Sequence, residues 1–412
     1  KQWGTFFGVS AAWKIAEENF IKNNFEWLND LKLRAGWGQV GDDGKLVGNH
    51  TYFTTYYYAF NGIPTAGLGL GTIANPNLSW ETKNNFNIGL DWGILNSRLH
   101  GTFDYFLSRT KNKIGKRKLP INQEITEIDY NLSQVDGSHG FEVGISSVNI
   151  HNKKFKWNTD FVLSYYRNYF VERDANYVLG INETQRMDVN DMWEYVVEGM
   201  IPAGNRNAGA LKIKDLDGYL RDENGNIKMV NGKPAYLGAP DGKIDEADMV
   251  YKGNSTPIPF SLNNSFEFGN FDFNIYFYGM ANNWQKNRTY TLFAGALQNV
   301  AEKGENTLKE LGDRWAYDNM GSKKPSIFVN AESTAEQRNG YYLEKAWFLR
   351  CDNVSLGYTF KPKKKCFSSL RVYASARNLF VISPYSGADP ETDSQAAYPN
   401  ARTYTLGIDL TF

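Results

Sequence analysis

Aspartates between residues 215 and 248 have the spacing of a calcium-binding loop. Asp215-Leu216-Asp217 and the segment 240–248 give the pattern D-x-D-x-D-G-x-I-x-x-x-D when residues 218–239 are set aside. Such loops supply carboxylates at positions 1, 3, 5, 9 and 12 and a backbone carbonyl at position 7. The predicted Ca²⁺ ligands are therefore Asp215, Asp217, Asp241, Asp245 and Asp248, with the carbonyl of Lys243.

The same residues also fit a purely structural turn. Asp217-Gly218 and Asp241-Gly242 are typical of β-turns. The insertion must fold back as a hairpin, Tyr219-Leu220 against Ala235-Tyr236, to reunite the two halves of the loop. An aspartate at position 12 is shorter than the usual bidentate glutamate, which weakens calcium binding. The sequence leaves both interpretations open.

Enzymatic chemistry and nucleic-acid binding have little support. The histidines His50, His100, His139 and His151 are scattered, and a His139 that merely follows Ser138 in sequence lacks the geometry of a nucleophile and its base. Lys+Arg and Asp+Glu both number 45, so no net charge favours nucleic acid. We expect no enzyme, no required cofactor and no nucleic-acid partner.

Strand periodicity dominates the chain. In the last ten residues, from Thr403 to Phe412, apolar and polar side chains alternate without interruption, which is the pattern of a strand with two different faces. A phase slip in 139–151 predicts a β-bulge near Ser146-Ser147. The predicted strands are roughly 5–15, 30–40, 82–92, 97–111, 139–151, 154–170, 257–268, 271–282, 345–360, 367–380 and 401–412.

The connections between these strands alternate between tight turns and long polar segments. The long ones are 41–81, 112–138, 171–256, 283–344 and 381–400, and the link 16–29 is of medium length. Outer-membrane barrels have short periplasmic turns and long extracellular loops. The chain is therefore predicted to be all-β, an antiparallel transmembrane β-barrel. No helical membrane span is expected, because the mean hydropathy is −0.51.

Eleven strands would leave two open edges, which the hydrocarbon core of a membrane does not tolerate. The remaining strands are expected to come from missing sequence or from another chain. If the parent is a 22-stranded outer-membrane transporter, residues 1–412 are the C-terminal part of its one barrel domain, with the signal peptide, plug domain and first strands elsewhere. Residues 171–256 are predicted to be a long extracellular loop with an inserted hairpin. Cys351 and Cys366 are expected to lie too far apart to form a disulfide.

Two sets of side chains could contact a substrate or plug. Arg371, Tyr373 and Arg377 alternate along one strand and should face the lumen, where contact with a plug domain is expected. The aromatic run Tyr56-Tyr57-Tyr58 in the first long loop could stack on sugar rings. That run could equally form a loop hairpin or part of the aromatic girdle at the membrane interface.

Several segments resemble SusC-like (RagA-type) TonB-dependent outer-membrane transporters. They are 348–360 (FLRCDNVSLGYTF), 377–380 (RNLF), 385–391 (YSGADPE), 398–404 with the closing strand, 31–38 (LKLRAGWG) and 80–89. The resemblance covers essentially the whole chain, although the loops are individual.

This resemblance implies energised import of oligosaccharides or peptides across the outer membrane of a Gram-negative bacterium. The implied partners are a SusD-like surface lipoprotein, the TonB system through the missing N-terminal part, and outer-membrane lipid and lipopolysaccharide. Two alternatives stay open: a siderophore or cobalamin receptor of the same fold, and a structural or adhesive barrel without transport.

Overall fold

The structure is a computed structural model of the 412-residue chain. It describes residues 3–43, 52–60, 63–72, 75–119, 127–216, 218–223, 226–230, 233–238, 240–287, 309–326, 340–362, 367–392 and 400–412.

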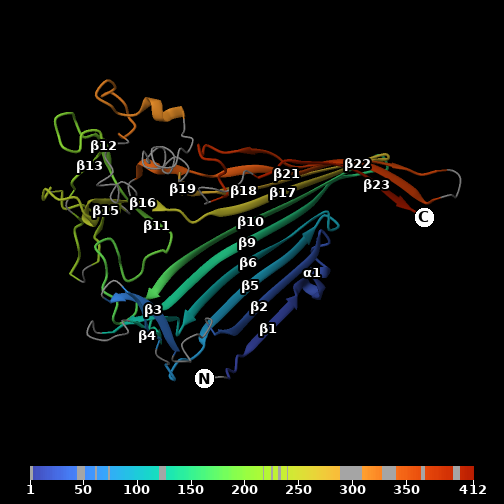
Figure 1. The fold of residues 1–412 in the computed structure, drawn as a ribbon. Helices are drawn as coiled ribbons and strands as arrows, with labels where there is room; N and C mark the ends of the chain where they lie inside the picture. The colour runs from blue at the N-terminus through green and yellow to red at the C-terminus, as the bar shows by residue number, and fades with distance from the viewer. Residues whose placement is uncertain are drawn as a thin grey trace.

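One antiparallel sheet of eleven strands forms the body of the protein (Figure 1). Its strands lie side by side in the order in which they occur along the chain. The all-β prediction and the count of eleven strands in one sheet are confirmed. The strands in order are β1 (Gly8–Lys14), β2 (Leu28–Asp42), β5 (Glu81–Ile94), β6 (Leu99–Lys111), β9 (Val135–His151), β10 (Phe155–Glu172), β17 (Ile258–Phe268), β18 (Phe271–Ala281), β21 (Phe348–Phe360), β22 (Ser369–Ile382) and β23 (Thr403–Thr411).

Tight turns join strands at one end of the sheet, and long connections join them at the other (Figure 1). The first link carries η1 (Ile15–Glu17) and α1 (Asn19–Lys22). The long connections form small two-stranded sheets: β3 (Tyr52–Phe60) with β4 (Ile63–Thr72), β7 (Ile114–Lys118) with β8 (Glu127–Asn131), β11 (Asp191–Tyr195) with β16 (Met249–Asn254), β12 (Val197–Met200) with β13 (Leu211–Ile213), β14 (Met229–Val230) with β15 (Lys233–Pro234), and β19 (Trp284–Lys286) with β20 (Leu343–Lys345).

Three short 3-10 helices complete the long connections: η2 (Glu246–Asp248), η3 (Lys309–Asp313) and η4 (Gly340–Tyr342). Within the described ranges, every helix is too short or too polar to span a membrane.

Cross-strand register places apolar side chains on one face of the large sheet. Trp37 of β2 lies opposite Phe86 of β5, and Val372 of β22 lies opposite Ile408 of β23. On β23 the side chains of Leu406 and Ile408 are 86% and 70% exposed. Because residues two apart point to the same side of a strand, this alternation separates an apolar face from a polar face.

The phase slip in β9 is a β-bulge at Asn149. Val148 pairs with Asn158 and Ile150 pairs with Trp157, so Asn149 has no opposite residue on β10. Its side chain donates from Nδ2 to Thr159 Oγ1 at 2.7 Å, which anchors the bulge. The bulge therefore lies two residues beyond the predicted position and restores the alternation of faces.

Buried apolar side chains gather in the long connections and at the adjoining strand ends. A single sheet layer has no second layer to pack against, so its own side chains remain largely accessible. The buried apolar residues are Leu78, Val135, Tyr195, Ala208, Ala210, Leu211, Tyr219, Ile227, Trp315, Tyr342, Ala346, Phe348 and Cys351.

Candidate functional site

An arginine–aspartate cluster crosses three strands on the polar face. Arg34 of β2 donates from Nε and Nη2 to Asp91 of β5 at 2.7–3.0 Å, and from Nη2 to Asp104 of β6 at 2.9 Å. Gly89 lies opposite both Arg34 and Asp104. A Cβ atom there would come within 2.5 Å of Asp104 Oδ1 and 2.7 Å of Arg34 Cζ. The glycine therefore leaves room for arginine to cross the intervening strand.

A second cluster is built the same way near the other edge of the sheet. Arg371 of β22 donates to Asp272 of β18 at 2.6 and 2.9 Å, and to Asp409 of β23 at 3.2 Å. Its path passes over Gly357, where a Cβ atom would lie 2.6 Å from Nε. Its guanidinium carbon also lies 4.7 Å from the ring centroid of Tyr373. These bonds fix the spacing of β18, β21, β22 and β23.

Two of the three predicted lumen residues thus take part in contacts within the barrel wall. Arg371 forms ion pairs between strands, and Tyr373 covers Gly407, whose added Cβ would lie 2.3 Å from the Tyr373 Cζ atom. Arg377 lies further along β22 and lines a cavity. Contact of any of the three with a plug domain stays a prediction.

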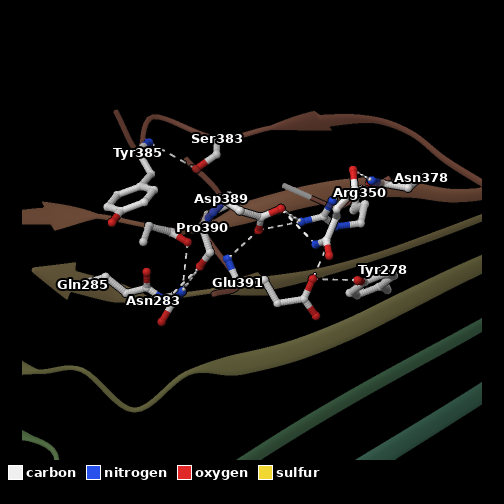
Figure 2. A network of polar contacts seen from close by, with 12 residues as sticks. Tyr278, Asn283, Gln285, Arg350, Asn378, Ser383, Tyr385, Asp389, Pro390 and Glu391 are labelled. Atoms are coloured by element: carbon white, nitrogen blue, oxygen red, sulfur yellow. Dashed lines mark hydrogen bonds and ion pairs between the residues drawn. The ribbon is translucent and has the colours of Figure 1, made fainter. Parts of the chain in front are cut away.

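Arg350 is the centre of a buried polar network where β21 begins (Figure 2). It is 2% exposed and donates from Nη2 to both carboxylate oxygens of Asp389, at 2.8 and 2.9 Å. Nη1 donates to Asn378 Oδ1, and Nε lies 3.3 Å from Glu391 Oε2. The Tyr278 hydroxyl donates to the same Glu391 oxygen at 2.7 Å. A buried guanidinium is tolerated because carboxylates on two sides pair with it.

The network fastens the loop after β22 onto the sheet. Asn400 donates to Asp389 Oδ2 at 2.9 Å. The Pro390 carbonyl accepts hydrogen bonds from Asn283 at 3.2 Å and from Gln285 at 2.9 Å (Figure 2). The loop is therefore bound by side chains from β18, β19, β21 and β22 together.

Sequence reasoning did not assign a role to this network, although Arg350, Asn378 and Asp389 lie in the segments 348–360, 377–380 and 385–391. Arg350 lies in the first of these segments, Asn378 in the second and Asp389 in the third. The signal that could have located it is the concentration of charged and amide residues in three short motifs. Their spacing of 28 and 39 residues from Arg350 hides the contact from any local pattern.

A cavity of about 510 Å³ lies beside this network. Arg377 and Asp352 bring opposite charges to its wall, and Tyr278, Asn400 and Thr403 add hydrogen-bonding groups. Such a wall suits a polar ligand that carries several hydrogen-bonding groups or both signs of charge.

The aspartates of the predicted calcium loop are brought together as a turn. Asp215 Oδ2 accepts from the Gly242 N–H at 2.8 Å, and Asp241 Oδ1 accepts from the Lys243 N–H at 2.8 Å. The hairpin within the insertion pairs Tyr219 with Tyr236. Asp217 lies outside the described residues.

Asp248 uses both oxygens on backbone groups. Oδ1 accepts from the Leu216 N–H and Oδ2 from the Asp245 N–H, each at 2.7 Å, and the residue is 1% exposed. Asp245 and Asp248 also form the capping box of η2. Among the described side chains, no group of three or more His, Cys, Asp or Glu is arranged to hold a metal ion. Calcium binding by this turn stays a prediction.

The aromatic run in the first long connection forms β3. Tyr56, Tyr57 and Tyr58 pair with Gly67, Ala66 and Thr65 of β4. The side chains of these tyrosines lie outside the described part of the structure, so their contact with a ligand stays a prediction. Of the two cysteines, Cys351 is buried near the start of β21, and Cys366 lies outside the described residues.

Burial shifts two ionisable groups in the long connection between β10 and β17. The pKa of Glu194 is raised because burial disfavours its carboxylate, although Lys286 lies 3.4 Å away and opposes the shift. Burial, aided by the charge of Asp191, raises the pKa of Tyr251 to about 12. Tyr251 is therefore a neutral hydrogen-bond donor at physiological pH.

Comparison with known proteins gives a consistent picture. The family model described as "TonB dependent receptor-like, beta-barrel" matches residues 1–379. TonB-dependent receptor SusC of Bacteroides thetaiotaomicron is 31% identical over 434 residues, covering 100% of this chain and 40% of that protein. TonB-dependent receptor P26 of Formosa agariphila is 28% identical, covering 98% and 42%.

Solved structures show the same fold. The RagAB peptide importer in the 'closed-closed' state aligns with a TM-score of 0.74 at 22% identity, covering 99% of this chain and 43% of that chain. The RagAB peptide transporter aligns with a TM-score of 0.72, also at 22% identity. The chain thus spans about two fifths of the length of the relatives that it matches.

Proposed function

Because this chain belongs to the TonB-dependent receptor β-barrel family, we propose that it forms part of the wall of a nutrient importer. The importer lies in the outer membrane of a Gram-negative bacterium. The apolar face of the sheet contacts lipid and the outer leaflet's lipopolysaccharide, and the polar face lines the lumen around a plug domain. The tight turns face the periplasm and the long connections face the outside.

The observation that carries this proposal is the contrast between the two faces of the sheet. On β23, Leu406 and Ile408 are among the most exposed apolar side chains of the described chain, and a lipid environment would cover them. On the other face, Arg34 and Arg371 are held in ion-pair clusters that span several strands. An apolar outward face and a polar inward face are what the wall of an outer-membrane barrel presents.

The proposed cargo is an oligosaccharide or a peptide, taken up through a plugged barrel capped by a SusD-like lipoprotein. The similarity to SusC and the fold shared with the RagAB peptide importer support this choice. The TonB system would supply energy through the N-terminal part of the whole protein. We propose transport and no catalysis.

Affinity purification of the full-length protein from its own outer membrane tests the proposal. We expect a surface lipoprotein to co-purify in about equal amount, and we expect uptake of labelled tripeptides or maltotriose to require both that lipoprotein and TonB. Purification without any lipoprotein partner, combined with uptake that is unchanged when TonB is deleted, would contradict it.

A further inference from the structure

The cavity beside Arg350, named the Arg350 cavity below, has a volume of about 510 Å³ and is lined by β18, β21, β22, β23 and the loop after β22. Its size lies within the range of about 300–1,000 Å³ that is usual for sites of small ligands. Apart from Ala401, every side chain of its wall is polar or charged. The charged ones are Arg350, Asp352, Arg377 and Glu391, so the chemistry of the cavity depends on how these groups are paired.

Two of these charges, Arg350 and Glu391, are already paired with each other. Arg350 Nε lies 3.3 Å from Glu391 Oε2, and the same oxygen accepts from the Tyr278 hydroxyl at 2.7 Å (Figure 2). Asn378 is engaged at both ends of its amide, because Oδ1 accepts from Arg350 and Nδ2 donates to the Asn400 carbonyl at 2.8 Å. These groups hold the loop in place, and a ligand would have to compete with the fold for them.

Asp352 and Arg377 are in a different position. Neither side chain forms a hydrogen bond or an ion pair with another residue in the part of the chain that the structure describes. Asp352 is partly buried, Arg377 is exposed, and both line the cavity, so a ligand there reaches both side chains. The wall therefore presents one acid and one base that are paired neither with each other nor with the Arg350 network.

A β-bulge in β21 places Asp352 beside the cavity. The pairing of β21 with β18 and with β22 shifts at Asp352, which has no opposite residue on either strand. The next residue, Asn353, lies directly opposite Arg377 on β22. Asn378, which follows Arg377, has a φ of 50°, a left-handed conformation that asparagine tolerates. Bulges often lie next to functional sites, where they redirect a side chain, and this one brings an acid within one register position of the arginine.

We propose that the Arg350 cavity binds the two charged ends of a short peptide, with the α-carboxylate on Arg377 and the α-ammonium on Asp352. Both contacts are charge-assisted hydrogen bonds, which are stronger than those between neutral groups. A zwitterion satisfies both wall groups at once, whereas a simple anion or cation leaves one of them unpaired. This inference rests on the proposed import function and names the class of cargo that this part of the polar face recognises.

A neutral oligosaccharide fits this wall less well than a zwitterion. Its hydroxyls could hydrogen-bond Asp352 and Arg377 but would neutralise neither charge. The aromatic side chain of the wall, Tyr278, already packs against Tyr276 and Phe348, at 6.3 and 5.8 Å between ring centroids. Its hydroxyl proton is donated within the protein. The charges of the wall therefore favour a peptide over a sugar.

Isothermal titration calorimetry on the full-length protein in detergent, with triglycine as the ligand, tests the proposal. We expect saturable binding, and we expect Arg377→Gln and Asp352→Asn each to raise the dissociation constant about tenfold, the effect of one charge-assisted hydrogen bond. Lys83→Gln is the control, because Lys83 is exposed on β5 and does not line the cavity. Binding should be unchanged in this variant. Equal melting temperatures of the wild type and the three variants verify that the fold is kept.

Blocked peptides assign each charge to its partner. Triglycine amide lacks the carboxylate, so it should bind the wild type about tenfold more weakly than triglycine does, and Arg377→Gln should weaken it no further. Acetyl-triglycine lacks the ammonium group, and Asp352→Asn should likewise have no further effect on its binding. Weakening of all three ligands by the same factor in both variants would reject the assignment of the two ends.

Three further results would overturn the proposal: no saturable binding of triglycine at millimolar concentration, binding that neither variant weakens, or maltotriose binding that both variants weaken in the same way. Uptake of labelled triglycine by whole cells is measured separately. TonB-dependent uptake that is unchanged in both variants rejects the cavity assignment alone. Binding in the cavity without TonB-dependent uptake of peptide or oligosaccharide rejects the import function.

Discussion

Arg350 shows how a single side chain can hold a loop that carries no regular structure. Nη2 donates to both carboxylate oxygens of Asp389, Nη1 donates to Asn378, and Nε lies within ion-pair distance of Glu391. Removing one carboxylate would leave a buried charge without its main partner, which is much more costly than losing a surface ion pair.

We expect Asp389→Ala to lower the free energy of unfolding by about 3–5 kcal/mol. Urea unfolding of the whole protein in liposomes measures the change. The matched control is Glu267→Ala, which removes the exposed pair with Lys156 at 2.7 Å and should cost at most about 1 kcal/mol. Similar losses in the two variants would show that the Arg350 network does not stabilise the barrel.

Gly89 allows a second prediction about one position. Gly89→Ala should destabilise the barrel by about 1–3 kcal/mol, because the added Cβ displaces Arg34 from Asp104. Gly36→Ala on β2 is the control, since its nearest neighbour would be the Ser10 Cβ at 3.7 Å. The same urea titration compares them, and an equal effect at both positions would reject the steric argument.

The strands of the large sheet were predictable because their period of two extends over many residues. All eleven predicted segments overlap a strand of the sheet, although β9 starts at Val135, four residues before its predicted start. The short strands β7, β12 and β19 were not predicted, because three to five residues carry no clear period and tertiary pairing sets them.

The candidate site was predictable only where the strand pattern extends to it. The alternation in β22 placed Arg371, Tyr373 and Arg377 on one face. It could not show that Arg371 would reach Asp272, 99 residues earlier in the chain. Nor could it reveal the cavity beside the Arg350 network, whose walls come from residues as far apart as Tyr278 and Thr403.

The aspartate turn gives a prediction about one loop. If it binds Ca²⁺, cleavage by endoproteinase Lys-C at the exposed Lys243 should slow about tenfold when free Ca²⁺ is about ten times the dissociation constant. Cleavage at Lys153 in the turn between β9 and β10 serves as the control. Asp215→Asn should abolish the calcium effect, and cleavage that is indifferent to Ca²⁺ would leave the turn as a structural one.

At the scale of the whole sheet, the property to test is whether the apolar face contacts lipid and the polar face does not. Leu406→Arg should destabilise the protein in liposomes by about 2–4 kcal/mol, because it places a charge against lipid near the middle of β23. Thr405→Arg, one residue away on the polar face, should cost clearly less. Equal losses measured by urea titration would argue that the apolar face is not in lipid.

The last prediction concerns which end of the sheet faces the outside of the cell. A cysteine introduced at Asn226 in the inserted hairpin should react with a membrane-impermeant maleimide on intact cells. A cysteine at Lys153, in the short turn between β9 and β10, should react only after the outer membrane is permeabilised. The reverse result would invert the proposed orientation.

The Arg350 network also acts on strand register. Because successive side chains alternate between faces, sliding β21 by a single residue would turn Arg350 toward the acyl chains and leave Asp389 and Asn378 without their guanidinium. A register shift of β21 is therefore unfavourable for two reasons: the charged guanidinium would face lipid, and the loop after β22 would lose its attachment to the sheet. The contacts of Arg350 thus favour the correct register among the last four strands of the sheet, β18, β21, β22 and β23.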